Sequence, residues 1–161
     1  VGSAGKIFSL TGWKVGWLTG PRELISVIAK AHQFLTFTTP PALQLGVAHG
    51  LAEEMDTAIA LAARLQDNRD LLAAELSGLG FEVLPSEGTY FLAANISALT
   101  NEKDRAFCER LAREAGVALI PLSEFFTGPN RPDTYVRFAF CKQRPVIEEA
   151  VKRLKAHFKR G

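Results

Sequence analysis

Two lysines near the start of the chain could bind one cofactor that carries both an aldehyde and a phosphate group. Lys6 follows Ser3-Ala4-Gly5, and Lys14 lies eight residues after Lys6. A lysine amine can form a covalent bond with an aldehyde carbon, while a serine hydroxyl and a second lysine can offer a hydrogen bond and a positive charge to a phosphate. We therefore expect Lys6 to be the catalytic nucleophile and Ser3 and Lys14 to bind the phosphate.

Arg137 is a candidate for binding the substrate, because it interrupts the otherwise apolar segment 135–140. Burying a guanidinium costs free energy unless an anion neutralises it. The planar guanidinium matches a carboxylate through two parallel hydrogen bonds, so we expect Arg137 to bind a substrate carboxylate. The alternative is an arginine on an edge strand that faces water.

Composition excludes several other classes of function. The chain has 161 residues, 47% of them hydrophobic, and a net charge of +2, which is too small to favour nucleic acid or a membrane surface as a partner. No apolar run approaches the roughly 18 residues that a membrane-spanning helix needs. Cys108 and Cys141 lack metal-site spacing and the three histidines are scattered, so we expect no metal site and two buried free thiols in a reducing cytosol.

The hydrophobic pattern predicts secondary-structure elements in two groups. Before residue 80 we expect one short strand and three helices, the last of them long and amphipathic; the strand covers 15–19, and the helices cover 22–32, 41–51 and 53–79. After residue 80 we expect four strands at 81–85, 89–94, 117–121 and 134–140, with helices at 101–115 and 145–158. Thr100 is the expected N-cap of the first of these two helices, and Gly116 marks its end.

The lysine segment resembles a known family. Its pattern, Ser-x-Gly-Lys-x-x-Ser-x-Thr-Gly-Trp-Lys-x-Gly over residues 3–16, is similar to the Schiff-base segment of class I/II aminotransferases that use pyridoxal 5'-phosphate. The similarity is greatest to the kynurenine/methionine aminotransferase branch, whose members often carry lysine where Lys14 stands. A Tyr-x-Arg-Phe string like the one around Arg137 also occurs in this family.

This resemblance implies a fold and a division into domains. The fold would be the α/β architecture of fold type I pyridoxal-phosphate transferases, which is aspartate aminotransferase-like. Residues 1–50 would be the end of the large cofactor-binding domain, and residues 51–161 the long linking helix and the small C-terminal α+β domain. The chain would thus be the C-terminal portion of a cytoplasmic, homodimeric enzyme.

The resemblance also implies an activity and further site residues. The whole enzyme would transfer the amino group of methionine, glutamine, kynurenine or an aromatic amino acid to a 2-oxo acid, with Lys6 moving the substrate's α proton and Arg137 binding its α-carboxylate. Phe37 matches a segment that in relatives reaches into the partner subunit's pocket, and Tyr90 lies in a segment that resembles a loop closing over the active site. Aromatic side chains in these loops favour an apolar or aromatic substrate. The chain alone should transaminate poorly, because the family's residues that contact the cofactor ring are not in it.

Two alternatives remain open at this point. The same residues would suit a carbon–sulfur β-lyase acting on cysteine conjugates or cystathionine-type substrates. A non-catalytic module derived from an aminotransferase is the other alternative, and it predicts that Lys6 can be replaced without loss of function.

Overall fold

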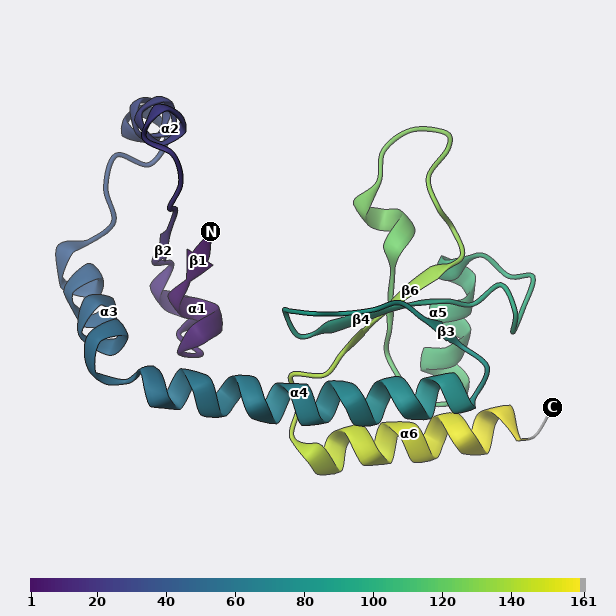
Figure 1. Cartoon of the computed structure of the whole chain (residues 1–161). Helices are drawn as coiled ribbons and strands as arrows, with labels where there is room; N and C mark the ends of the chain where they lie inside the picture. The colour runs from purple at the N-terminus through teal and green to yellow at the C-terminus, as the bar shows by residue number, and fades with distance from the viewer. Residues whose placement is uncertain (160–161) are drawn as a thin grey trace. The chain divides into compact units, whose positions relative to one another are not determined.

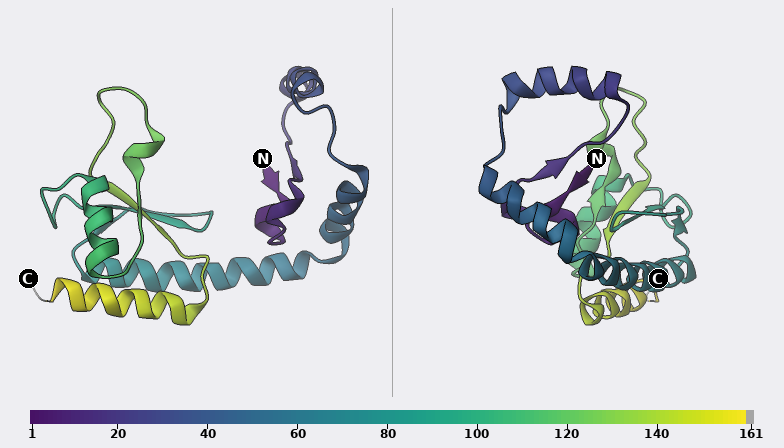
Figure 2. Two further views of the ribbon diagram at one scale, coloured as in Figure 1. Left: turned by 180° about the vertical axis from the view of Figure 1, so that it is seen from behind. Right: turned by 60° about the vertical axis from the view of Figure 1, so that its left-hand side comes forward.

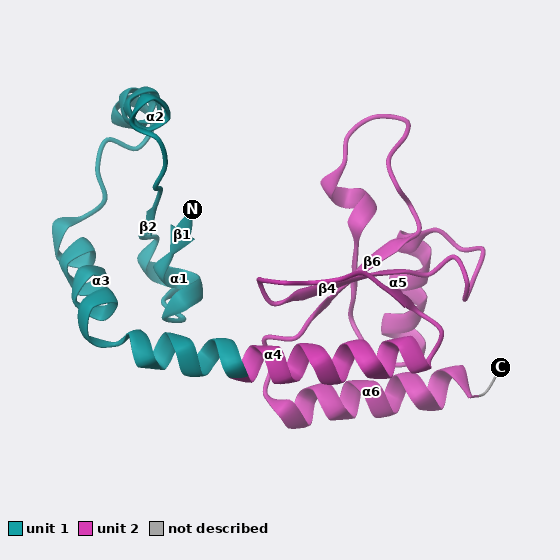
Figure 3. Cartoon of the chain, in the orientation of Figure 1, with its two compact units in different colours: residues 1–63 teal, residues 64–161 magenta. Residues whose placement is uncertain are grey.

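The computed structural model describes residues 1–159, which fall into two compact units (Figure 3). The division lies between Ala63 and Arg64, inside the long helix α4 (Met55–Gly78). Among the described residues, no helix is long and apolar enough to cross a membrane.

Unit 1 contains a two-stranded antiparallel ribbon and the first helices of the chain (Figure 1). The ribbon pairs β1 (Gly2–Ser3) with β2 (Gly16–Trp17), and between them lie α1 (Ala4–Ile7) and the short 3-10 helix η1 (Thr11–Trp13). After the ribbon come α2 (Arg22–Leu35), α3 (Pro41–Glu53) and the first part of α4. The three predicted helices are confirmed, whereas the predicted strand at 15–19 is limited to two residues.

The core of unit 1 is small. Ala4, Val15 and Val47 are its buried hydrophobic residues. Helix α2 buries none of its side chains within the described structure, and Phe34 and Leu35 at its end are 87% and 85% exposed. The apolar side chains of α2 therefore lie uncovered in unit 1 taken by itself.

Unit 2 is a four-stranded antiparallel sheet that shares a hydrophobic core with helices. The helices that pack against it can be followed in Figure 2. The strand order is β3 (Glu82–Val83), β4 (Phe91–Asn95), β6 (Tyr135–Ala139) and β5 (Ile120–Pro121), with α5 (Asp104–Glu114), η2 (Leu122–Phe125) and α6 (Arg144–Phe158) between or after the strands. The prediction of a helix-flanked, four-stranded sheet is confirmed.

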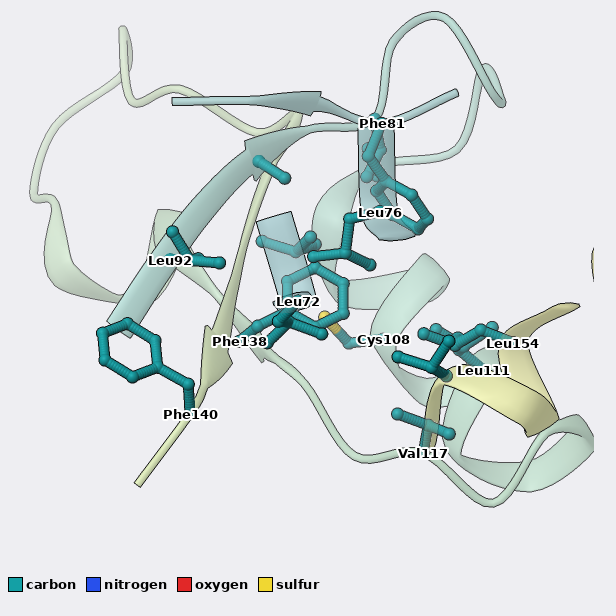
Figure 4. Packing of buried hydrophobic residues seen from close by; sticks show 14 of the residues in the cluster. Leu72, Leu76, Phe81, Leu92, Cys108, Leu111, Val117, Phe138, Phe140 and Leu154 are labelled. Carbon is teal, nitrogen blue, oxygen red and sulfur yellow. The ribbon is translucent and has the colours of Figure 1, made fainter. Parts of the chain in front are cut away.

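The alternation of side chains along β4 and β6 gives the sheet two different faces. Leu92 of β4 and Phe138 of β6 lie in the hydrophobic core with Leu72 of α4, Leu111 of α5 and Leu154 of α6 (Figure 4). Because successive strand residues point to opposite faces, the residues between these core positions point away from the helices. Arg137 is one of these outward-pointing residues.

A buried amide fixes α4 to the end of the strand that carries Arg137. Asn68 is 2% exposed, and its side-chain nitrogen donates to the carbonyl oxygens of Phe140 and Lys142, at 3.1 and 3.0 Å. These two carbonyl groups lie beyond the end of β6, where no neighbouring strand pairs with them. The Asn68 amide supplies the hydrogen bonds that they need. The strand is therefore held by its neighbours and by the long helix.

Two local predictions are wrong. Thr100 does not cap α5: its hydroxyl accepts the Glu102 N–H at 3.1 Å in the turn before the helix, and Lys103 occupies the N-cap position. Cys141 is exposed because it lies beyond the end of β6 and next to the last buried residue of that segment, Phe140, whereas Cys108 is buried as predicted. Gly116 follows the C-cap of α5 with φ +66°, so the end of the helix that the sequence predicted there is confirmed.

Candidate active-site residues

The segment that carries both candidate lysines is a loop closed at its base by backbone hydrogen bonds. Ser3 pairs with Gly16 in the β1–β2 ribbon, and the Ala4 N–H donates to the Val15 carbonyl at 3.0 Å. Lys6 and Lys14 both lie inside this closed loop, and both are exposed in unit 1. The three predicted cofactor residues, Ser3, Lys6 and Lys14, therefore belong to one local structure.

Glycines make this closure possible. A Cβ atom on Gly16 would lie 3.0 Å from the Gly2 carbonyl oxygen, and one on Gly2 would lie 2.3 Å from the Trp17 ring. At Gly5, a Cβ would lie 3.5 Å from the Ser3 hydroxyl oxygen and would occupy the space beside it. The missing side chain at Gly5 thus leaves the Ser3 hydroxyl accessible, which fits a loop that binds a phosphate.

Within residues 1–159, four residues other than glycine have positive φ angles, and they cluster in the candidate segments. They are Ser9 (57°), Lys14 (56°), Phe37 (68°) and Thr89 (63°). This left-handed conformation costs a residue with a side chain about 1–2 kcal/mol. Lys14 and Phe37 are predicted site residues, and Thr89 precedes a third, Tyr90. Backbone strain of this kind often accumulates where function requires a fixed geometry.

Arg137 lies on an interior strand, so the alternative of an edge-strand arginine is wrong. Strand β6 is bonded to β4 on one side and β5 on the other, and Arg137 is directly opposite Ala93 and Ile120. No acidic residue occupies either opposing position. The guanidinium Nε is buried and has no hydrogen-bond partner among residues 1–159.

Two aromatic rings surround the Arg137 guanidinium, and sequence reasoning did not identify this arrangement. Its Cζ lies 4.0 Å from the centroid of the Phe91 ring and 4.6 Å from that of the Phe125 ring. Both distances are within the range of cation–π attraction. Phe91 and Phe125 are both distant from Arg137 in the sequence, so no local spacing predicts these contacts.

The two remaining predicted residues lie in different units. Tyr90 belongs to unit 2, where its ring centroid is 4.4 Å from that of Phe91, so it joins the aromatic group around Arg137. Phe37 belongs to unit 1, follows α2 and is 74% exposed. Each unit therefore contains its own part of the predicted site: the lysine loop and Phe37 in one, Arg137 and the aromatic rings in the other.

The lysine loop and the arginine strand are together typical of one enzyme family, and comparison with known proteins agrees. The family model for aminotransferase class I and II matches residues 1–154. The chain belongs to this family. Its fold corresponds to part of the fold of the fold type I aminotransferases.

Relatives with curated names agree with this family assignment. The chain is 39% identical over 155 residues to a methionine aminotransferase of Escherichia coli, covering 96% of the chain and 40% of that protein. It is 34% identical over 170 residues to a kynurenine–oxoglutarate transaminase of Dictyostelium discoideum, covering 93% of the chain and 39% of that protein. The chain therefore spans about 40% of the length of these relatives.

Solved structures give the same result. The N-succinyldiaminopimelate aminotransferase of Mycobacterium tuberculosis superposes with a TM-score of 0.82 at 41% sequence identity, over 96% of this chain and 40% of the other. The fold of the chain is therefore similar to that of this aminotransferase over nearly all of the chain's length.

Proposed function

We propose that the whole protein is a pyridoxal-phosphate-dependent aminotransferase of amino acid metabolism. It would transfer the amino group of methionine, glutamine, kynurenine or an aromatic amino acid to a 2-oxo acid. The observation that carries this proposal is the closed loop that holds Ser3, Lys6 and Lys14 together, with the Ala4–Val15 hydrogen bond at its base. The names of two relatives, a methionine aminotransferase and a kynurenine–oxoglutarate transaminase, support methionine and kynurenine as amino donors.

In this proposal the lysine loop holds the cofactor. The Ser3 hydroxyl would donate to the phosphate, beside the space that Gly5 leaves open, and Lys14 would contribute a positive charge. Lys6 would bond the aldehyde carbon through its amine. When bound, pyridoxal phosphate supplies an electron-withdrawing ring that stabilises the negative charge left after the substrate's α carbon loses its proton.

Lys6 would also move the proton. Its Nζ amine would act as the base, and Lys6 lies on a short helix that begins directly after a strand of the ribbon. Its Nζ would take the proton from the substrate's α carbon and give it up again on the cofactor side, and water would then have to cleave the C–N bond to release the 2-oxo acid. An amine that both bonds the cofactor and transfers the proton must be held in place. The closed loop provides this restraint.

Arg137 would bind the substrate's α-carboxylate. Among the described residues it has no acidic partner, its Nε is buried, and its strand is fixed on both sides. An anion that arrives with the substrate would satisfy its outer nitrogens through two parallel hydrogen bonds. Tyr90 would line the side-chain pocket, Phe37 would reach into the pocket of a partner subunit, and both would favour apolar or aromatic substrates.

We further propose how the chain is divided and assembled. Residues 1–50 would complete the large cofactor-binding domain, and residues 51–161 would form the linking helix and the small domain of a cytoplasmic homodimer. The exposed apolar side chains of α2, including Phe34 and Leu35, support the homodimer. Exposed apolar patches often mark a surface that another protein surface covers.

An assay of the full-length holoenzyme tests the activity. We expect methionine, glutamine, kynurenine and phenylalanine, each with a panel of 2-oxo acids, to give one new amino acid for each donor consumed, and Lys6→Ala to abolish this. Release of a thiol and pyruvate from a cysteine conjugate, without amino transfer, would instead establish a β-lyase. Absence of both reactions would leave the non-catalytic alternative.

A further inference from the structure

The environment of Arg137 lacks the groups that usually hold an arginine in place. Its direct neighbours across the sheet are Ala93 and Ile120, and no hydrogen bond or salt bridge joins its side chain to another of the residues 1–159. A long side chain without such bonds retains several rotamers. A residue that must present a planar fork to a carboxylate needs some other restraint.

The rings of Phe91 and Phe125 provide this restraint from the two sides of the strand. Phe91 belongs to β4, which pairs with one edge of β6, and Phe125 belongs to η2, which follows β5 on the other edge. The Arg137 Cζ lies 4.0 and 4.6 Å from their ring centroids. The guanidinium is therefore attracted to aromatic faces contributed by both neighbouring strands or their extensions.

Aromatic rings and carboxylates differ in whether they leave the N–H groups of the guanidinium available for a further hydrogen bond. An aspartate or glutamate would hold the guanidinium by occupying its N–H groups, the same groups that a substrate carboxylate needs. A ring face attracts the cation through its quadrupole and occupies no N–H group. Two rings can thus fix the guanidinium and leave its hydrogen-bonding capacity to an incoming anion.

Phe125 is itself held by a buried hydrogen-bond pair. The Asp104 carboxylate accepts the backbone N–H of Ser123 at 2.8 Å and the Ser123 hydroxyl at 2.9 Å, and both residues are almost fully buried. Ser123 lies two residues before Phe125 in η2. The ring position therefore depends on a fixed loop, although the ring is 58% exposed.

We propose that Phe91 and Phe125 are positioning residues that hold the Arg137 guanidinium ready for the substrate's carboxylate. This rests on the carboxylate-binding role proposed for Arg137. The two rings would act through Arg137, so that replacing either would weaken recognition of the carboxylate group and leave recognition of the rest of the substrate intact.

A pair of inhibitors separates these effects in the full-length holoenzyme. 3-Phenylpropionate carries the carboxylate, and 3-phenylpropionamide has the same shape without the charge. The quantity to measure is the ratio of the inhibition constant of the amide to that of the acid. If Arg137 binds the carboxylate, the unmodified enzyme should favour the acid by more than about tenfold, and Arg137→Met should bring the ratio close to one.

The two ring positions are then tested against a matched control. Phe91→Leu and Phe125→Leu should each lower the ratio of inhibition constants by about threefold to tenfold. Phe91→Tyr and Phe125→Tyr keep an aromatic ring, so they should leave the ratio close to that of the unmodified enzyme. Phe126→Leu is the control, because Phe126 is next in the chain, is 50% exposed and makes no ring contact with the guanidinium in the described structure. It should leave the ratio unchanged.

The outcomes distinguish the two proposals. A ratio near one in the unmodified enzyme would overturn the role of Arg137 and the positioning role with it. A high ratio that Arg137→Met abolishes, but that the Phe91 and Phe125 variants alter no more than Phe126→Leu, would overturn the positioning role alone. Equal weakening of acid and amide by the leucine variants would show that the rings only supply apolar contact, which also contradicts the proposal.

Discussion

The Asp104 carboxylate accepts two hydrogen bonds from Ser123, one from the backbone N–H and one from the hydroxyl, at 2.8 and 2.9 Å. Asp104 is the first residue of α5, and Ser123 lies in η2. The carboxylate also lies at the positive end of the helix dipole, which stabilises a negative charge there. One buried side chain thus joins the start of a helix to the loop that carries Phe125.

Asp104→Asn should destabilise the protein by about 2 kcal/mol, because the amide turns one acceptor into a donor that faces the Ser123 donors. Ser123→Ala should cost less, about 1 kcal/mol, since it removes only the hydroxyl bond. Urea denaturation measures both values. Glu109→Gln, on the exposed surface of the same helix, should stay within about 0.5 kcal/mol of the unmodified protein. An Asp104→Asn variant as stable as this control would contradict the structural role of the pair.

Lys14→Gly should make the apo protein more stable and the cofactor less tightly bound. Lys14 has φ 56° and ψ 31°, a conformation that glycine adopts without strain, so we expect a gain of about 1 kcal/mol. Lys14→Ala is the matched control, because it removes the same charge and keeps the strain. Both variants should lose affinity for pyridoxal phosphate, but only the glycine variant should gain stability. Equal thermal midpoints for the two would show that the backbone there is unstrained.

Glu102 should make stability depend on acid pH. Hydrogen bonds from Arg110, at 2.7 and 2.9 Å, lower the pKa of Glu102 below its usual 4.5, although partial burial opposes this. A carboxyl group whose pKa is lower in the folded state stabilises the fold above its unfolded pKa, and this contribution is lost as the pH falls through the folded value. Because the pair is about one-third exposed, its contribution should not exceed about 1 kcal/mol.

The difference in unfolding free energy between the unmodified protein and Glu102→Gln measures this contribution. It should be constant above about pH 6 and should shrink as the pH falls below about 4.5. A difference that grows as the pH falls would contradict the assigned ion pair.

The two cysteines should differ in reactivity. Burial, with a smaller effect from the charge of Asp104, raises the pKa of the Cys108 thiol to about 12, whereas Cys141 is exposed. Since the thiolate is the reactive form, iodoacetamide at about pH 8 should modify Cys141 and leave Cys108 intact in the native protein. Mass spectrometry of tryptic peptides identifies the site. In the unfolded protein both cysteines should react, which is the control. Modification of both cysteines in the native protein as well would mean that α5 does not bury Cys108.

Much of the fold follows from patterns that are local in the sequence. The helices predicted at 22–32, 41–51, 53–79 and 145–158 are confirmed, because the apolar spacing that predicts each of them lies within one segment. The N-cap of α5 was wrong because Thr100 has a second use: its hydroxyl closes a turn with Glu102 before the helix starts. A sequence pattern does not distinguish these two uses of one hydroxyl.

The candidate site was predictable to a smaller extent. Ser3, Lys6 and Lys14 lie within one short segment whose chemistry is visible in the sequence. The rings near Arg137 come from β4 and from η2, and their meeting depends on strand order and on the turn after β5. No local spacing encodes a contact of this kind, so only the apolar surroundings of Arg137, and not its two ring partners, could be predicted.

The most direct test of the central claim is to find which residue bonds the cofactor. The full-length holoenzyme would be reduced with borohydride, which makes the bond between the lysine and pyridoxal phosphate permanent, and then digested and analysed by mass spectrometry. The account predicts a single modified peptide with the adduct on Lys6. An adduct on another lysine, or none, would contradict it.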